Sequence, residues 1–142
     1  MSNAQAIIET LLSQKTPIAF HALGPSMNPT ILNGDSLLID SIANRDIQPG
    51  NIILYRVCDR LSAHRAVFYH IRTKAWFVVS DAALEGGNWI PRNEIIGLAV
   101  SVRHNGRTRR LDTRRARWAG LARFLLRPLR RAAVGIHQRL TK

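Results

Sequence analysis

Six short runs rich in β-branched, aromatic and other apolar residues lie between residues 18 and 104, and turn residues separate them. Pairs such as Asn33-Gly34 and Pro49-Gly50 stand at the boundaries. Short strands punctuated in this way are typical of a small, mostly antiparallel β domain. The pattern therefore predicts a mainly β fold that is coiled or barrel-like, with strands in residues 18–23, 36–42, 51–57, 63–72, 75–80 and 95–104.

Two local signals extend this β domain at its ends. The Asn105-Gly106 pair follows the last run and predicts a tight hairpin that returns through residues 107–111. Residues 3–14 precede the first run and predict a short amphipathic helix, because their apolar residues recur at helical spacing. These apolar residues are Ile7, Ile8, Leu11 and Leu12.

The composition changes at residue 113, where arginines begin to alternate with apolar residues at about the helical period. The apolar members are Trp118, Leu121, Leu125 and Leu129. This pattern predicts a basic amphipathic helix, kinked or broken near Pro128. We therefore divide the chain into an N-terminal helix at residues 1–16, a β domain at 17–112 and a helical tail at 113–142.

The net charge of +12 is concentrated in the C-terminal part of the chain. Residues 1–102 hold eight basic and eight acidic residues, whereas residues 103–142 hold thirteen Lys and Arg and the single acid Asp112. Such a tail suits three roles: packing on the body through its apolar stripe, lying in an anionic membrane surface, or binding nucleic acid. The first two are favoured equally, because no DNA-binding motif accompanies the arginines.

Residues 24–40, GPSMNPTILNGDSLLID, are the strongest candidate for a catalytic segment. Ser26 stands in a tight Gly-Pro-rich turn just after an apolar run, where the turn would fix the direction of its hydroxyl. A serine hydroxyl is a weak nucleophile unless a base lies within hydrogen-bond reach. By itself, a serine in such a turn is more often a structural residue, so catalysis requires further catalytic residues elsewhere in the chain.

The segment resembles the nucleophile box of the superfamily that contains type I signal peptidases and the self-cleaving SOS repressors. In that box Ser-Met is followed by x-Pro-Thr and then by Gly-Asp, and the matching residues here are Ser26, Met27, Pro29, Thr30, Gly34 and Asp35. Residues 49–56, 61–69 and 78–100 resemble the family's next three boxes in the same order. The resemblance covers about residues 17–102 and implies a signal-peptidase-like serine endopeptidase that removes a leader or signal-like segment from a polypeptide at a small-residue site.

By this resemblance, Ser26 is the nucleophile and His64 is the general base. His64-Arg65 stands where bacterial signal peptidases have Lys-Arg, and a histidine there is similar to the endoplasmic-reticulum and archaeal-like branch. An imidazole with an ordinary pKa near 6.5 is mostly neutral at pH 7 and can accept the serine proton.

The resemblance makes Asp81 the leading candidate for the third catalytic residue, because Ser-Asp at 80–81 falls where the family has Gly-Asp. Glu85, or no acid at all, remains an alternative, since the later acidic position of the eukaryotic-type enzymes is Gly87 here. Three residues are expected to support the turn or the oxyanion: Gly24, Met27 and Asp35. Many signal peptidases have a serine donor where Gly24 stands, although the repressor-type relatives also have glycine there.

Two other functions stay open: self-cleavage of the repressor type, and an inactive fold that binds a membrane or nucleic acid. The sequence has no Ala-Gly ahead of Ser26, which disfavours self-cleavage.

We expect no cofactor and no metal, because no ligand cluster, phosphate loop or dinucleotide fingerprint is present. The sequence has neither an apolar run of about 18 residues nor an export signal, and we expect a cytoplasmic protein at the inner membrane face with a polypeptide substrate. The single cysteine, Cys58, is expected in the core.

Overall fold

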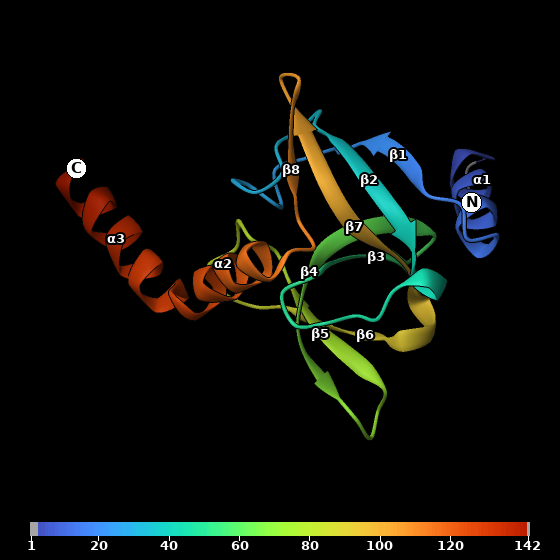
Figure 1. The fold of residues 1–142 in the computed structure, drawn as a ribbon. Helices are drawn as coiled ribbons and strands as arrows, with labels where there is room; N and C mark the ends of the chain where they lie inside the picture. The colour runs from blue at the N-terminus through green and yellow to red at the C-terminus, as the bar shows by residue number, and fades with distance from the viewer. Residues whose placement is uncertain (1–2, 142) are drawn as a thin grey trace.

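The computed structural model describes residues 3–141 and consists of an antiparallel sheet with helices at both ends of the chain (Figure 1). The predicted fold class, a small mainly β domain with terminal helices, is therefore confirmed. In chain order the elements are α1 (Asn3–Ser13), β1 (Ile18–His21), β2 (Ser36–Ser41), η1 (Ile42–Asn44), β3 (Ile52–Val57), β4 (Arg60–His70), β5 (Ala75–Val79), β6 (Asn88–Pro91), η2 (Arg92–Glu94), β7 (Ile95–His104), β8 (Arg107–Arg110), α2 (Arg114–Leu125) and α3 (Arg127–Leu140).

All strands within residues 3–141 belong to one eight-stranded sheet in the order β1-β2-β7-β3-β4-β5-β6, with β8 paired to β7. Every pairing is antiparallel. Figure 1 shows that the sheet coils instead of lying flat. The predicted turn at Asn105-Gly106 joins β7 to β8, and both residues have the positive φ that a tight hairpin turn requires.

Strand β6 is the one strand that the sequence does not predict. It is only four residues long, and Ile90 is its single buried residue. Pro91 ends the strand at the register position opposite Ala75. A proline is tolerated there because β6 is an edge strand. Strand β1 is equally short, but its apolar run continues to Leu23, whereas Trp89 and Ile90 stand between Asn88 and Pro91 and form no such run.

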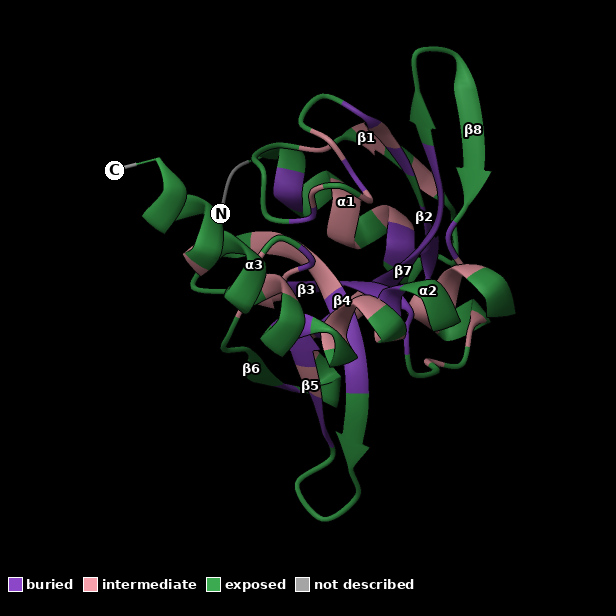
Figure 2. Ribbon diagram, turned by 90° about the vertical axis from the view of Figure 1, so that its left-hand side faces the viewer, coloured by how far each residue is buried: buried purple, intermediate pink, exposed green. Residues whose placement is uncertain are grey.

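Strand β3 separates two hydrophobic cores. Ile52 and Leu54 belong to one core, and Ile53 and Tyr55 belong to the other. All four residues are at most 3% exposed, and Figure 2 shows the buried residues concentrated in these central strands. Because both faces of β3 are buried, the strand has a continuous apolar sequence, and it provides a rigid support for the neighbouring strand β4.

The tail forms two helices, α2 and α3, that meet at Leu126. The predicted break is therefore present, two residues before Pro128. Proline then stands in the first turn of α3, where its missing N–H costs no helical hydrogen bond. Within residues 3–141, no helix has both the length and the hydropathy that crossing a membrane requires.

The expectation that Cys58 lies in the core is wrong. Cys58 is exposed, because it lies in the tight turn between β3 and β4, where Cys58 and Asp59 both have positive φ.

Candidate active site

Ser26 lies on a loop that leaves β1 and returns to β2. The loop is closed at its base, where the N–H of Ala22 donates to the carbonyl of Asp35 over 2.8 Å and the N–H of Gly34 donates to the carbonyl of Ala22 over 2.8 Å. Gly24 has a φ of +86°, and its N–H donates to Oδ1 of Asn33 over 2.8 Å. Because a side chain at this φ would be strained, glycine is required at position 24 for the shape of the loop.

Met27 and Asp35 anchor the loop to the body. Met27 is 4% exposed and belongs to the core beneath the loop. The Asp35 carboxylate accepts the N–H of Leu32 over 2.8 Å and a hydrogen bond from Nδ1 of His104. Burial would raise the pKa of Asp35, but these hydrogen bonds and the nearby positive charges outweigh it and hold the pKa below its usual range. Both residues therefore act as loop supports.

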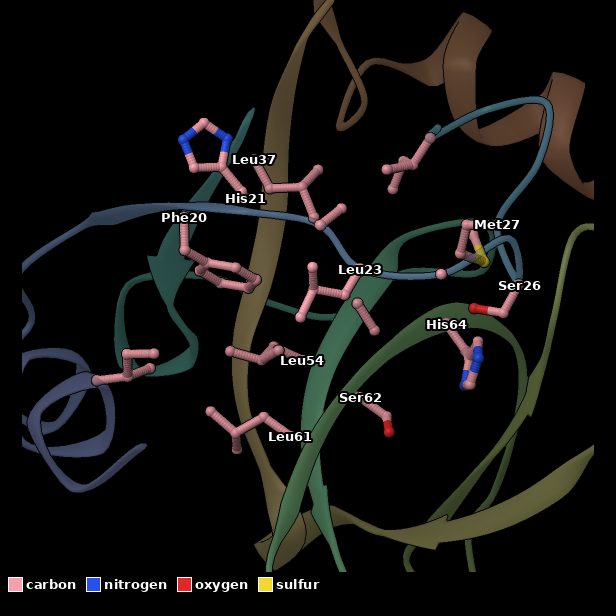
Figure 3. Close-up of a pocket in the computed structure, with 15 residues that line it drawn as sticks. Phe20, His21, Leu23, Ser26, Met27, Leu37, Leu54, Leu61, Ser62 and His64 are labelled. Atoms are coloured by element: carbon pink, nitrogen blue, oxygen red, sulfur yellow. The ribbon is translucent and has the colours of Figure 1, made fainter. Parts of the chain in front are cut away.

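Ser26 and His64 line the same pocket. The pocket has a volume of about 410 Å³ and mainly apolar walls. Figure 3 shows the two side chains together at one end, with the Ser26 hydroxyl next to the His64 ring, whereas Phe20 and His21 lie at the other end. Ser26 is exposed on its loop and His64 is half-buried in β4. The loop and the sheet thus bring together two residues that are far apart in the sequence.

Tyr55 holds the imidazole of His64. The hydroxyl of Tyr55 lies 2.6 Å from Nδ1 of His64. The register explains this contact: Ile53 pairs with His64, and Tyr55 lies two residues further along β3 on the same face. Burial raises the pKa of Tyr55 to about 12, so its hydroxyl stays protonated at neutral pH. The sequence does not indicate Tyr55 as a site residue, because only the register between β3 and β4 places it beside His64.

His64 is set to be neutral at physiological pH. Burial lowers the pKa of His64 below its ordinary value, and the negative charge of Asp81 works in the opposite direction. The net effect is a lowered pKa, because loss of hydration disfavours the charged imidazolium. A neutral imidazole can accept a proton, as a general base must.

Asp81 is bound to Arg65 instead of the His64 ring. Its carboxylate receives Nε of Arg65 over 2.8 Å and Nη2 over 2.6 Å, and it also accepts the Thr30 hydroxyl over 2.5 Å. Consecutive residues on a strand point to opposite faces, so Arg65 lies on the side of β4 away from His64. The Asp81–Arg65 pair is almost fully buried, with side chains 2% and 3% exposed. Asp81 thus acts on His64 through its charge, and on the loop through Thr30.

The segment around Asp81 also holds the backbone of Ser26. The carbonyl of Ser26 accepts the N–H of Ala82 over 3.1 Å and the hydroxyl of Ser80. The residues on either side of Asp81 therefore fix the Ser26 loop, while Asp81 itself fixes Thr30 four residues further along that loop. Ser80 and Ala82 are positioning residues that sequence reasoning did not identify, since their contacts use the backbone of a distant segment.

Glu85, the alternative acid, lies outside this arrangement. Its carboxylate is 73% exposed and pairs with Arg131 of α3 at 3.1 Å. Within residues 3–141, no group of three or more His, Cys, Asp or Glu side chains is arranged to hold a metal ion. The site consequently consists of a serine, a histidine and a tyrosine, with a buried Asp–Arg pair beneath the serine loop.

The chain matches no established protein-family model and no curated protein. Ser26 and His64 belong to two separate segments, the loop after β1 and strand β4, and they meet in one pocket.

Proposed function

We propose that this protein is a serine endopeptidase of the signal-peptidase type, with Ser26 as nucleophile and His64 as general base. The observation that supports it most is the meeting of Ser26 and His64 at one end of a largely apolar pocket. These are the residues that the nucleophile box and the general-base box indicate independently of any structure. Their proximity depends on the loop closure and on strand pairing, neither of which the motifs contain.

The proposed reaction begins with proton transfer from Ser26 to His64. The Oγ of Ser26 attacks the scissile carbonyl carbon, and Nε2 of His64 takes the hydroxyl proton as the new C–O bond forms. The imidazolium then gives this proton to the leaving amine, which departs as the C–N bond breaks. Water then attacks the carbonyl carbon of the acyl-serine while His64 accepts a proton from it. His64 returns this proton to Oγ of Ser26 as the ester C–O bond breaks.

Tyr55 gives His64 the orientation that this reaction requires. When the ring proton is on Nδ1 and is donated to the oxygen of Tyr55, Nε2 is the nitrogen available to Ser26. In a Ser-His-Asp triad a carboxylate occupies this position and stabilises the imidazolium. Here the stabilising charge comes from Asp81 without a direct hydrogen bond. We therefore assign Asp81 as a positioning residue that acts through charge and through the loop.

The oxyanion site of this enzyme has few donors. The N–H of Ser26 is available on the loop, whereas Pro25 has no N–H and Gly24 has no hydroxyl. One missing oxyanion donor commonly costs about two to three orders of magnitude in rate. We expect a slow enzyme, which suits the processing of a small number of substrates.

The substrate is proposed to bind as an extended peptide. Strand β1 is the terminal strand of the sheet, so one of its backbone edges has no partner strand in the described chain. This edge leads into the Ser26 loop, and Phe20 of β1 and Leu61 of β4 line the pocket next to it. A polypeptide added to this edge would gain backbone hydrogen bonds, and the apolar pocket would receive one of its side chains. Cleavage after small residues is what the resemblance to signal peptidases implies.

Self-cleavage is less well supported. The only Ala-Gly pair in the chain is Ala119-Gly120. Gly120 is buried in α2, and a Cβ added there would lie 2.1 Å from Arg65 Cζ. A peptidase of this kind cleaves an extended segment, whereas Ala119 and Gly120 lie within the packed helix α2.

The N-terminal peptides of cells that produce the protein test this function. Wild type, Ser26→Ala and His64→Ala are compared by mass spectrometry, with Ser13→Ala and His70→Ala as controls outside the pocket. We expect new N-termini after small residues with wild type and both controls, and their loss with Ser26→Ala and His64→Ala. Identical N-termini in all five samples, with candidate substrates detected, would refute the proposal.

A further inference from the structure

The first turn of helix α3 attaches the tail to the body of the protein through arginines. Arg127 is buried, and its guanidinium donates to the carbonyls of Gly86 over 2.7 Å and Ser80 over 3.2 Å. Arg130 donates to the carbonyl of Asp81 over 2.9 Å. Arg127 and Arg130 are three residues apart, which places both side chains on one side of the helix. The tail is therefore attached to the segment between β5 and β6 by arginines binding backbone carbonyls.

The apolar side of α3 faces solvent. Leu129, Ile136 and Leu140 lie on one face at helical spacing and are 68%, 59% and 81% exposed. Helix α2 adds Trp118 and Leu125, which are 64% and 73% exposed. Beyond Arg130 every described residue of α3 except the half-buried Gly135 is exposed, so the apolar stripe of this helix does not pack on the core. Single exposed leucines are common, but several exposed apolar side chains gathered on α3, with two more on α2, indicate an apolar partner.

The charge of the tail decides which partner fits. Residues 113–142 contain eight Arg and one Lys and no Asp or Glu. Arg114, Arg115 and Arg139 are exposed. A second copy would bring two sets of like charges together around the same stripe. Nucleic acid would satisfy the arginines but would leave the leucines and the tryptophan in water. An anionic lipid surface satisfies both, because it offers headgroup charge above an apolar layer.

We propose that the apolar face of α2 and α3, formed by Trp118, Leu125, Leu129, Ile136 and Leu140, binds an anionic lipid bilayer. The helices would lie in the plane of the headgroups, with exposed arginines at lipid phosphates. This binding goes beyond the proposed peptidase function and holds whether or not Ser26 is catalytic. Since the arginines of α3 also bind the carbonyls of Ser80, Asp81 and Gly86, the candidate active site would be held at the membrane surface.

Vesicle flotation with the full chain tests this proposal. The probes are vesicles of phosphatidylcholine alone and of phosphatidylcholine with about one third phosphatidylglycerol, and we expect wild type to bind the anionic vesicles at least about tenfold more tightly. Ile136→Asp and Leu129→Asp replace side chains that are exposed in the free protein, so folding is retained. Each is expected to weaken binding about tenfold or more, since it places a charge in the lipid interface.

Ile7→Asp is the matched control. Ile7 is 59% exposed on α1, which lies at the opposite side of the molecule from α3 in Figure 1, so the variant should bind as wild type does. Equal binding to neutral and anionic vesicles, or unchanged binding of both tail variants, would overturn the proposal. A dimer that sediments as such and is dissociated by Ile136→Asp, without vesicle binding, would also overturn it and assign the face to a second copy.

Discussion

At the scale of single residues, the site differs from a Ser-His-Asp triad in what holds the histidine. Tyr55 occupies Nδ1 of His64, and as a neutral phenol it fixes the ring without supplying a negative charge. The nearest carboxylate that influences His64, that of Asp81, is engaged by Arg65 and Thr30. The imidazolium is therefore stabilised less than in a full triad, which agrees with the lowered pKa of His64.

This arrangement predicts the pH dependence of the reaction. His64 must be neutral to accept the Ser26 proton, and burial lowers its pKa. Activity should therefore be present above this lowered pKa and should disappear as the pH falls through it. We expect the acidic limb of a plot of kcat/KM against pH to have its midpoint below the ordinary histidine pKa of about 6.5.

Tyr55→Phe should keep this limb but reduce kcat by about a hundredfold, because the ring loses its orientation. A limb centred above the ordinary value, or an unchanged kcat in Tyr55→Phe, would contradict the assignment.

The sequence indicates the proposed catalytic residues Ser26 and His64, but not the residues that contact them. Ser26 and His64 occupy motif positions, and the structure brings them into one pocket. Tyr55 and Ser80 are not predictable in the same way, since their roles depend on strand register and on a contact between distant loops. Asp81 is predicted as the third catalytic residue, but its carboxylate binds Arg65 and Thr30, because β4 presents Arg65 on the face opposite His64.

At the scale of elements, the segment between β5 and β6 joins the Ser26 loop to the tail. Its residues Ser80 and Ala82 hold the carbonyl of Ser26. The same segment accepts hydrogen bonds from arginines of α2 and α3 through its carbonyls. Arg65 lies at the centre of this junction: it binds Asp81 and the carbonyl of Gly50, and Gly120 of α2 packs directly on its guanidinium. The junction has no space for a side chain at position 120.

Asp81→Asn separates a positioning role from a role as the third member of a triad. The change leaves the buried Arg65 without its counter-charge, so we expect the free energy of unfolding to fall by about 3–5 kcal/mol in urea denaturation. Glu85→Gln is the control, because this carboxylate is exposed and its ion pair contributes at most about 1 kcal/mol. The acidic limb of Asp81→Asn should also move to lower pH, since the charge that raises the pKa of His64 is gone. Unchanged stability with a loss of rate of about ten-thousandfold would instead assign Asp81 to a triad.

Most of the strands are predictable from the sequence, and the elements that are not share a physical cause. Runs with several buried residues, such as β3 and β7, are recognisable as continuous apolar segments and are located within one or two residues. Strand β6 has one buried residue and no period. The tail has a clear helical period, but the sequence does not show which side of the helix packs. The arginines of α3 bind backbone carbonyls of the body, so the apolar side is left exposed.

At the scale of the whole molecule, the sheet, the Ser26 loop and the tail form one connected structure. Strands β3 and β4 carry Tyr55 and His64, the loop between β1 and β2 carries Ser26, and the tail packs on the segment that holds this loop. The exposed apolar face of the tail is turned away from these contacts. A membrane-bound tail and a peptide cleft are therefore compatible in one molecule.

The most direct test of the central claim is hydrolysis of a synthetic peptide library with small residues at varied positions by the purified protein. The products are identified by mass spectrometry for wild type and Ser26→Ala, each confirmed as folded by circular dichroism. We predict slow cleavage after small residues by wild type and none by Ser26→Ala. Cleavage by Ser26→Ala at the wild-type rate and at the same bonds would contradict the account, because the reaction would then not use the Ser26 hydroxyl.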